Sequence, residues 1–175
     1  MNKKFLKKAV ELSQESFKQG KFPAGAVLVK NNTIVATETS SVYPHQHLHA
    51  ETKIIDRMMA ETNQLLEEYD LYTSLVPCLM CLGKIYWSGI KRIFYVLARE
   101  DVNVEYSYEG THNFNDIVNA LNRKIEFTQD KRFFDEALEI YNKWEVKWNY
   151  SIWIDTWLTR NDVKSRFRVK DFFNK

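Results

Sequence analysis

Apolar residues recur every three or four positions in several stretches of the chain, which is the spacing that gives a helix one apolar face. In the first stretch Phe5, Ala9 and Leu12 share a side and Gly20 follows as a stop signal, so we predict a helix over about residues 3–18. Further helices are predicted over residues 48–66, beginning near His49, over 78–89, over 113–124 and over 130–148.

Shorter stretches rich in β-branched and aromatic residues predict strands between these helices. They cover residues 24–30, 33–40, 70–76, 91–98 and, with a weaker pattern, 124–129. Asn31 and Asn32 separate the first two strands, and asparagine tolerates the positive φ angles that a tight hairpin turn requires. The order of elements predicts an α/β fold of three layers, α/β/α, in which helices flank a mixed central sheet of about five strands.

The composition is typical of a folded globular protein, with 45% hydrophobic and 27% charged residues in a chain of 175. We therefore predict a single domain over residues 1–175, with a motif-bearing core over about 3–101 and a helical, aromatic-rich C-terminal extension over about 112–175. The extension holds four of the five tryptophans, which we interpret as packing residues of the core or of a contact with a second subunit.

Charge and hydropathy exclude some classes of function. No apolar run reaches the roughly 20 residues that a membrane helix needs, and the first residues form a helical pattern rather than a signal peptide. We therefore expect a cytoplasmic protein with no membrane partner. The net charge of +2 gives no electrostatic reason to expect a nucleic-acid partner, and we interpret the basic cluster around Arg160, Lys164 and Arg166 as a solvated helix face.

The only two cysteines of the chain are Cys78 and Cys81, directly behind Pro77 at the predicted start of a helix. The partial positive charge and free N–H groups of a helix N-terminus favour thiolates. Three interpretations fit this spacing: a redox dithiol, part of a metal site, or two buried cysteines that act as small apolar side chains. The two thiols alone do not decide between them.

His49 and Glu51, at the start of another predicted helix, favour the metal site. A catalytic zinc takes three protein ligands and leaves a fourth position for water, and His49, Cys78 and Cys81 make such a set. The two helix starts lie at the same edge of a sheet built from strand–helix units. Glu51 would then reach the open position without being a ligand, as a base that takes a proton from a zinc-activated water and returns it to a leaving group.

Other histidines and other kinds of zinc site are weaker candidates. His45 and His47 alternate with His49, but they precede the helix and are interpreted as polar loop residues, with a pocket role left open for His47. A structural zinc knuckle would prefer a fourth cysteine or histidine ligand, and the chain has no third cysteine to supply one.

The pairing of His-x-Glu with Pro-Cys-x-x-Cys resembles the zinc motifs of the cytidine deaminase superfamily. The resemblance covers about residues 22–101. Within the superfamily, this stretch is similar to the branch of bacterial guanine deaminases and tRNA adenosine deaminases. PAGAVLV resembles a strand of that branch, and CLGKIYW followed by KRIFYV is closer to guanine deaminases. The resemblance implies a zinc-dependent hydrolase that releases ammonia from a purine base or nucleoside, with a guanine-like substrate favoured, and a homodimer.

The resemblance also implies contacts with the substrate. The candidate residues are Phe22, Ser41, His47, Ala50, Trp87 and Glu109. Trp87 would line the base pocket, and Glu109 is the nearest candidate for an acidic residue that guanine deaminases donate from a swapped C-terminal segment. Ser40 or Ser41 stands where the family typically carries an asparagine, and a serine cannot make the same bidentate contact. A substrate other than guanine therefore stays open.

Rival functions remain beside this one. The chain could be a tRNA adenosine deaminase, or another deaminase of the nucleoside or cytosine type. From other classes, it could be a non-catalytic module that keeps the deaminase fold, or an assembly protein that zinc stabilises and whose aromatic tail forms an interface. The intact set of Glu51 and the three metal ligands argues against the non-catalytic module.

Overall fold

The computed structural model describes residues 2–42, 45, 47–102 and 112–148. The chain divides into two compact units, Met1–Tyr141 and Asn142–Lys175, which we consider separately. The sheet, the candidate site and the helical residues that pack on the sheet belong to the first unit. The single domain over the whole chain stays a prediction.

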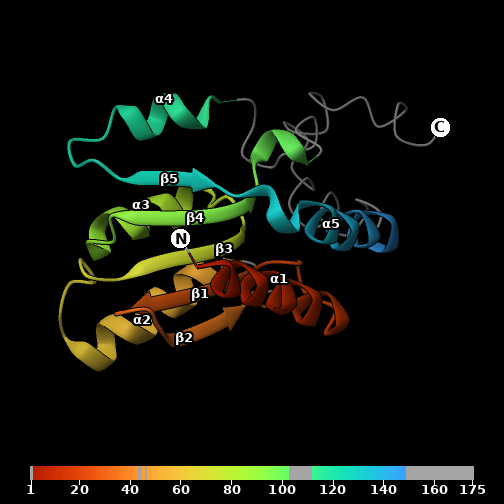
Figure 1. The fold of residues 1–175 in the computed structure, drawn as a ribbon, viewed down its shortest axis with the longest axis horizontal. Helices are drawn as coiled ribbons and strands as arrows, with labels where there is room; N and C mark the ends of the chain where they lie inside the picture. The colour runs from red at the N-terminus through yellow and green to blue at the C-terminus, as the bar shows by residue number, and fades with distance from the viewer. Residues whose placement is uncertain (1, 43–44, 46, 103–111, 149–175) are drawn as a thin grey trace. The chain divides into compact units, whose positions relative to one another are not determined.

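A mixed sheet of five strands forms the centre of the first unit (Figure 1). The strands are β1 (Gly25–Lys30), β2 (Thr33–Thr39), β3 (Asp70–Leu75), β4 (Arg92–Leu97) and β5 (Glu126–Gln129), in the spatial order β2-β1-β3-β4-β5. Strand β1 is antiparallel to both of its neighbours, whereas β3, β4 and β5 are parallel. Every strand except β1 therefore runs in the same direction, and the carboxyl ends of β2, β3 and β4 meet at one edge.

The hairpin between β1 and β2 fixes the register of the outer strand. Asn31 and Asn32 have φ angles of 51° and 59°, the left-handed conformation that the sequence predicted for this turn. A register shift between Leu28 and Val29 then places Glu38 opposite Ala26, and Ala26 lies opposite Thr73 on the other side of β1. These three residues form one row across the sheet and project from the same face.

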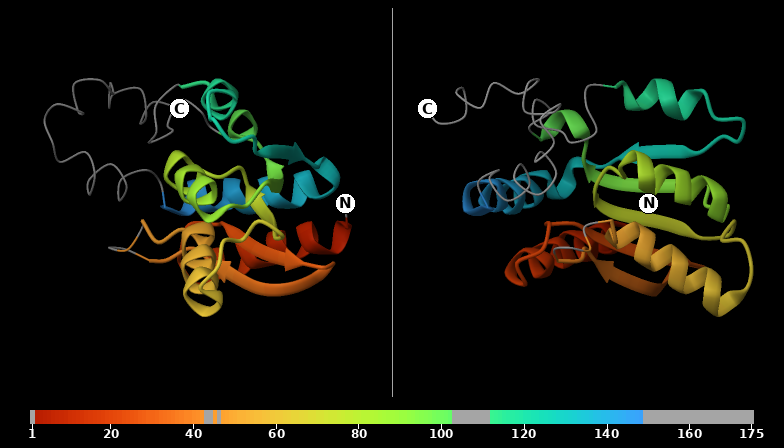
Figure 2. Two further views of the ribbon diagram at one scale, coloured as in Figure 1. Left: turned by 90° about the vertical axis from the view of Figure 1, so that its left-hand side faces the viewer. Right: turned by 180° about the vertical axis from the view of Figure 1, so that it is seen from behind.

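Helices cover both faces of the sheet, so the predicted α/β/α layers are confirmed. The helices are α1 (Lys3–Lys18), α2 (Ala50–Thr62), α3 (Leu79–Ser88), α4 (Phe114–Asn119) and α5 (Phe134–Trp148). One buried cluster joins residues of α2, α3 and α4 to one face of the sheet, and a second joins α1 and the first turns of α5 to the other. The view from behind in Figure 2 shows α2 and α3 side by side in front of the strands.

The end of α2 differs from the sequence prediction. The pattern predicted a helix as far as residue 66, but α2 ends at Thr62 because Asn63 adopts a left-handed conformation with a φ of 51°. The N–H of Asn63 donates to the Met59 carbonyl oxygen and closes the last turn. Leu66 lies outside the helix but is fully buried in the core. Its apolar side chain therefore continued the helical spacing of apolar residues in the sequence, although the helix had already ended.

None of the helices within the described ranges combines the length and the apolar composition needed to cross a membrane.

Helix α1 lies very close to the sheet at Gly25, the first residue of β1. A methyl group added at Gly25 would lie 2.3 Å from the Ala9 carbonyl oxygen and 2.5 Å from Leu12 Cβ. The first of these neighbours is helix backbone and cannot move aside alone. The close packing of α1 on β1 therefore requires a residue without a side chain at this position.

Replacement of Gly25 by alanine is expected to lower the free energy of unfolding by about 1–3 kcal/mol, because the new methyl group overpacks the α1–β1 contact. Urea denaturation followed by far-ultraviolet circular dichroism measures the change. A midpoint equal to that of the unchanged chain would contradict the close approach.

Candidate functional site

The candidate site lies where α2 and α3 begin, at the edge formed by the carboxyl ends of β2, β3 and β4. His49 is the N-cap of α2 and Cys78 is the N-cap of α3. An N-cap side chain commonly accepts a hydrogen bond from its own helix, but neither of these two does so. Both side chains are therefore available to point away from their helices and toward one another.

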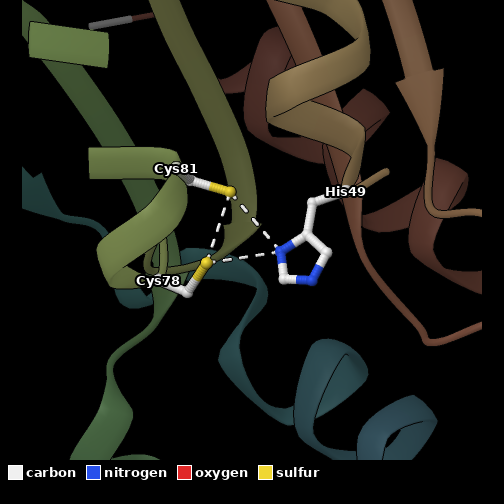
Figure 3. Close-up of side chains that lie close together, drawn as sticks. All are labelled: His49, Cys78 and Cys81. Atoms are coloured by element: carbon white, nitrogen blue, oxygen red, sulfur yellow. Dashed lines mark hydrogen bonds between the residues drawn. The ribbon is translucent and has the colours of Figure 1, made fainter. Parts of the chain in front are cut away.

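His49, Cys78 and Cys81 form a compact cluster (Figure 3). His49 Nδ1 lies 3.3 Å from Cys78 Sγ and 3.4 Å from Cys81 Sγ, and the two sulfurs are 3.4 Å apart. A tetrahedral zinc with Zn–S bonds of about 2.3 Å and a Zn–N bond of about 2.0 Å separates such ligands by about 3.5–3.8 Å. The cluster therefore fits zinc after shifts of a few tenths of an ångström.

Local hydrogen bonds hold the histidine in place. Thr52 Oγ1 donates to the His49 carbonyl oxygen at 2.9 Å, and the Lys53 N–H donates to the same oxygen at 3.0 Å. The first turn of α2 thus fixes the backbone of its own N-cap, while the imidazole faces the sulfurs. Of the three candidate ligands, Cys81 is fully buried, whereas His49 and Cys78 are partly accessible.

The two thiols titrate as a coupled pair. The close contact between the two sulfurs lowers the pKa of Cys78 to about 4, with a further contribution from His49. The same contact, together with burial, raises the pKa of Cys81. One thiolate therefore forms easily at the N-terminus of α3, and a divalent cation would stabilise the second one as well.

Glu51 lies beside the cluster, in the first turn of α2. Its side chain is buried, with 5% of the residue exposed, and its Oε2 atom is 3.6 Å from Cys81 Sγ. Burial raises the pKa of the Glu51 carboxyl, and the nearby His49 opposes that shift. A carboxyl whose pKa is raised holds and releases a proton more readily near neutral pH than an exposed one, as a proton carrier requires.

Comparison with known proteins supplies the family. Residues 1–97 match the model of the cytidine and deoxycytidylate deaminase zinc-binding region, which is more than half of the chain. The chain belongs to this family. It is accordingly a deaminase, a hydrolytic enzyme with a zinc cofactor, and its His49, Cys78 and Cys81 are positioned to hold the metal ion.

Individual relatives in this family carry different names. A probable cytosine deaminase of Schizosaccharomyces pombe is 33% identical over 129 residues, which are 70% of this chain and 79% of the relative. The guanine deaminase of Bacillus subtilis is 35% identical over 130 residues, or 71% and 83% of the two chains. A tRNA-specific adenosine deaminase of Buchnera aphidicola is 37% identical over 133 residues, or 74% and 79%.

The fold is shared with solved structures of the superfamily. The guanine deaminase of Nitrosomonas europaea superposes with a TM-score of 0.71 at 21% identity, and the match covers 83% of this chain and 85% of that one. At this level of identity the likeness shows the fold alone.

The structure brings four of the sequence-predicted site residues together. The three ligands and Glu51 are neighbours, and Ala50, fully buried, is the first residue of α2 between His49 and Glu51. The role of each of these residues in catalysis or binding stays a prediction.

The remaining candidates are less closely associated with the cluster. Phe22 is half-buried and packs edge-on against Tyr141, with ring centroids 6.2 Å apart. His47 is exposed, and Trp87 is 78% exposed in the last turn of α3, at the opposite end from Cys78. Glu109 lies outside the described residues. Their contacts with a substrate stay predictions.

Two buried hydroxyl groups near this edge have no hydrogen-bond partner among the residues that the structure describes. They are Ser40 Oγ, 2% exposed as a residue, and Thr73 Oγ1, which is fully buried. Ser40 was already a candidate from the sequence. Thr73 was not, because its place opposite Ala26 depends on which strands pair and on their register.

Loss of a sulfur ligand is expected to abolish tight metal binding. In Cys78→Ala, zinc measured by elemental analysis after dialysis should fall from about one ion per chain to less than a tenth of that, because two ligands hold zinc far more weakly than three. The matched control is His45→Ala, which removes an exposed histidine of the adjacent loop and should keep its zinc. Full zinc content in Cys78→Ala would refute the ligand set.

Proposed function

We propose that this deaminase hydrolyses the exocyclic amino group of a purine base or nucleoside, with a guanine-like base favoured, and releases ammonia. The observation that carries the proposal is the buried Glu51 carboxyl beside the cluster of His49, Cys78 and Cys81. A structural metal site has no need of a carboxylate that is next to the metal but outside the ligand set. A hydrolytic site needs such a group to move protons.

Glu51 is placed to carry the proton through both halves of the reaction. Zinc bound at the cluster would polarise a water molecule and make it nucleophilic near neutral pH. The Glu51 carboxylate accepts the proton that this water loses on attack at the amine-bearing ring carbon. The same carboxyl, whose pKa is raised by burial, then donates that proton to the amino group as the carbon–nitrogen bond breaks, and ammonia leaves.

The two helix N-termini supply the electrostatic environment for this step. The first N–H groups of a helix have no partner within the helix, and they carry partial positive charge. α2 and α3 both direct these groups toward the cluster, because their N-caps His49 and Cys78 are metal ligands. Negative charge that develops on the attacking oxygen would be stabilised there.

The buried hydroxyls of Ser40 and Thr73 support a polar, planar substrate. Thr73 projects from the sheet face that α2 and α3 cover, since it lies opposite Ala26 of the same buried cluster. A buried hydroxyl without a partner costs free energy, and a substrate with ring nitrogens or carbonyl groups would satisfy it. We propose that Ser40, rather than Ser41, takes the position of the family asparagine. Ser40 is buried and its hydroxyl has no partner among the described residues, whereas Ser41 is the more exposed of the two.

One observation favours a guanine-like base over the alternatives. The helix sequence CLGKIYW resembles guanine deaminases more than tRNA adenosine deaminases. Overall identity does not separate them, since the cytosine, guanine and tRNA adenosine deaminases are 33%, 35% and 37% identical to the chain. A cytosine-type base and the adenosine of a tRNA remain the alternative substrates, and the assay below includes both.

We also propose that the enzyme is a homodimer that uses the outer surface of α3. Trp87 is 78% exposed and Met80 is 42% exposed, seven residues apart and so on the same side of the helix. Gly83 lies between them and has open space around its Cα. A tryptophan left largely in water is typical of an interface, where it would be buried against another chain.

A cytoplasmic location is part of the same proposal. Both cysteines are free thiols in the structure, and the metal site requires them to stay reduced. A reducing compartment maintains that state.

The zinc-loaded enzyme should release ammonia from at least one member of a panel of guanine, adenine, cytosine, their nucleosides and an unmodified tRNA, with the highest kcat/KM for guanine. Glu51→Gln should keep its zinc and lose at least about a thousandfold in kcat, because the amide cannot carry the proton. Ammonia is measured by a coupled assay and zinc by elemental analysis. A turnover of Glu51→Gln equal to that of the unchanged enzyme would contradict the role of Glu51. A higher kcat/KM for tRNA or for cytosine than for guanine would show that the substrate is not guanine-like.

Introduction of a charge on the exposed face of α3 should dissociate the proposed dimer. Trp87→Glu is expected to sediment as a monomer at concentrations at which the unchanged enzyme sediments as a dimer, because a carboxylate cannot be buried there without a partner. The control is Leu65→Glu, which changes another exposed apolar residue that lies outside α3. A dimer that persists in Trp87→Glu would place the interface elsewhere.

A further inference from the structure

Two basic side chains of α2, one helical turn apart, hold the carboxyl end of β2. Lys53 Nζ donates to the Thr39 carbonyl oxygen at 2.8 Å and lies 3.0 Å from Glu38 Oε2. Arg57 donates to Glu38 Oε1 at 2.8 Å and to the Thr37 carbonyl oxygen at 3.3 Å. The helix therefore binds three consecutive residues of this edge strand, through backbone carbonyls and through one carboxylate.

The contact between Lys53 and Glu38 is better shielded from water than an ordinary surface ion pair. The side chains of Glu38 and Lys53 are 19% and 26% exposed, whereas those of the Lys91–Glu67 pair are 50% and 49% exposed. Glu38 also projects from the sheet face that α2 covers, since it lies opposite Ala26. Ionic contacts that are partly buried are screened less by solvent and salt, so these hold the strand more firmly.

The held segment leads directly to the substrate side of the site. The next residue after Thr39 is Ser40, whose N–H donates to the Ala24 carbonyl oxygen at 3.3 Å and whose buried hydroxyl has no partner among the described residues. The helix that holds this strand end is also the helix that begins at His49 and carries Glu51. One rigid element therefore sets the position of both the chemical groups and the strand end opposite them.

We propose that Lys53 and Glu38 are positioning residues of this enzyme, which fix Ser40 relative to the metal cluster and thereby set the affinity for the base. Neither residue touches the reacting atoms in this account. Without their contacts, the end of β2 would have to be ordered when the substrate binds, which weakens binding. The proton transfer by Glu51 would be unchanged. This proposal rests on the proposed function, because Ser40 can affect the affinity for a base only if it contacts the base at this site.

The decisive variant is Lys53→Met, which keeps the length of the side chain and removes its donors and charge. With the base that the unchanged enzyme prefers, KM is expected to rise about tenfold while kcat stays within about twofold and the zinc content is unchanged. Lys53→Arg should restore most of the affinity, because a guanidinium can donate both to the Thr39 carbonyl oxygen and to Glu38. The control, Lys91→Met, removes an exposed pair at the opposite edge of the sheet and should leave KM as it is.

A loss in kcat at unchanged KM, or an equal rise in KM in Lys91→Met, would overturn the proposal. A second readout separates it from the proposed function. Hydrogen–deuterium exchange of peptides over residues 37–42 should be faster in Lys53→Met and unchanged in Lys91→Met, whether or not a substrate is found. If no member of the panel is deaminated, the proposed function fails, and unchanged exchange in Lys53→Met would overturn the positioning role by itself.

Discussion

The candidate site depends on one constraint: α2 and α3 begin at the same edge of the sheet, each on an N-cap residue whose side chain does not cap its own helix. The strand order β2-β1-β3-β4-β5, with β2, β3 and β4 running the same way, creates that edge. His49 and Cys78 meet there at 3.3 Å although they are 29 residues apart in the chain. Cys81 follows one turn later and completes a set of three nitrogen and sulfur ligands. A zinc ion held by three protein ligands keeps a position for water, and this open position makes the site catalytic.

The same arrangement requires several groups to be placed unfavourably. Burial beside the two cysteines raises the pKa of the Glu51 carboxyl, and the Ser40 and Thr73 hydroxyls are buried without partners among the described residues. Each of these costs stability, and the proposed function accounts for them, since a bound metal ion and a polar base would satisfy them. The Glu38 contacts with Lys53 and Arg57 act in the opposite direction, because they stabilise the strand end that leads to Ser40. Buried polar groups at the site therefore lower the stability of the fold, and the ion pairs and hydrogen bonds around Glu38 offset part of that cost.

Much of this could be predicted from the sequence because the signals are local. The helical spacing of Phe5, Ala9 and Leu12 and the Asn31–Asn32 turn were confirmed, and so was the five-stranded sheet. The metal ligands could be identified because each motif lies within four residues of a helix start. The buried hydroxyl of Thr73 and the hold of Lys53 on β2 could not, because they depend on which strands become neighbours and on their register. The end of α2 was misplaced because Leu66 continues the apolar pattern after Asn63 has left the helix.

The open zinc site can be tested by X-ray absorption spectroscopy at the zinc edge, on the zinc-loaded protein without substrate. We expect two sulfur neighbours at about 2.3 Å and two nitrogen or oxygen neighbours at about 2.0–2.2 Å, of which one is the histidine and the other a water. In Glu51→Gln the same shell should remain, because the carboxylate is not a ligand. A shell without two sulfurs, or one in which the Glu51→Gln variant loses a neighbour, would contradict an open zinc site built from His49, Cys78 and Cys81.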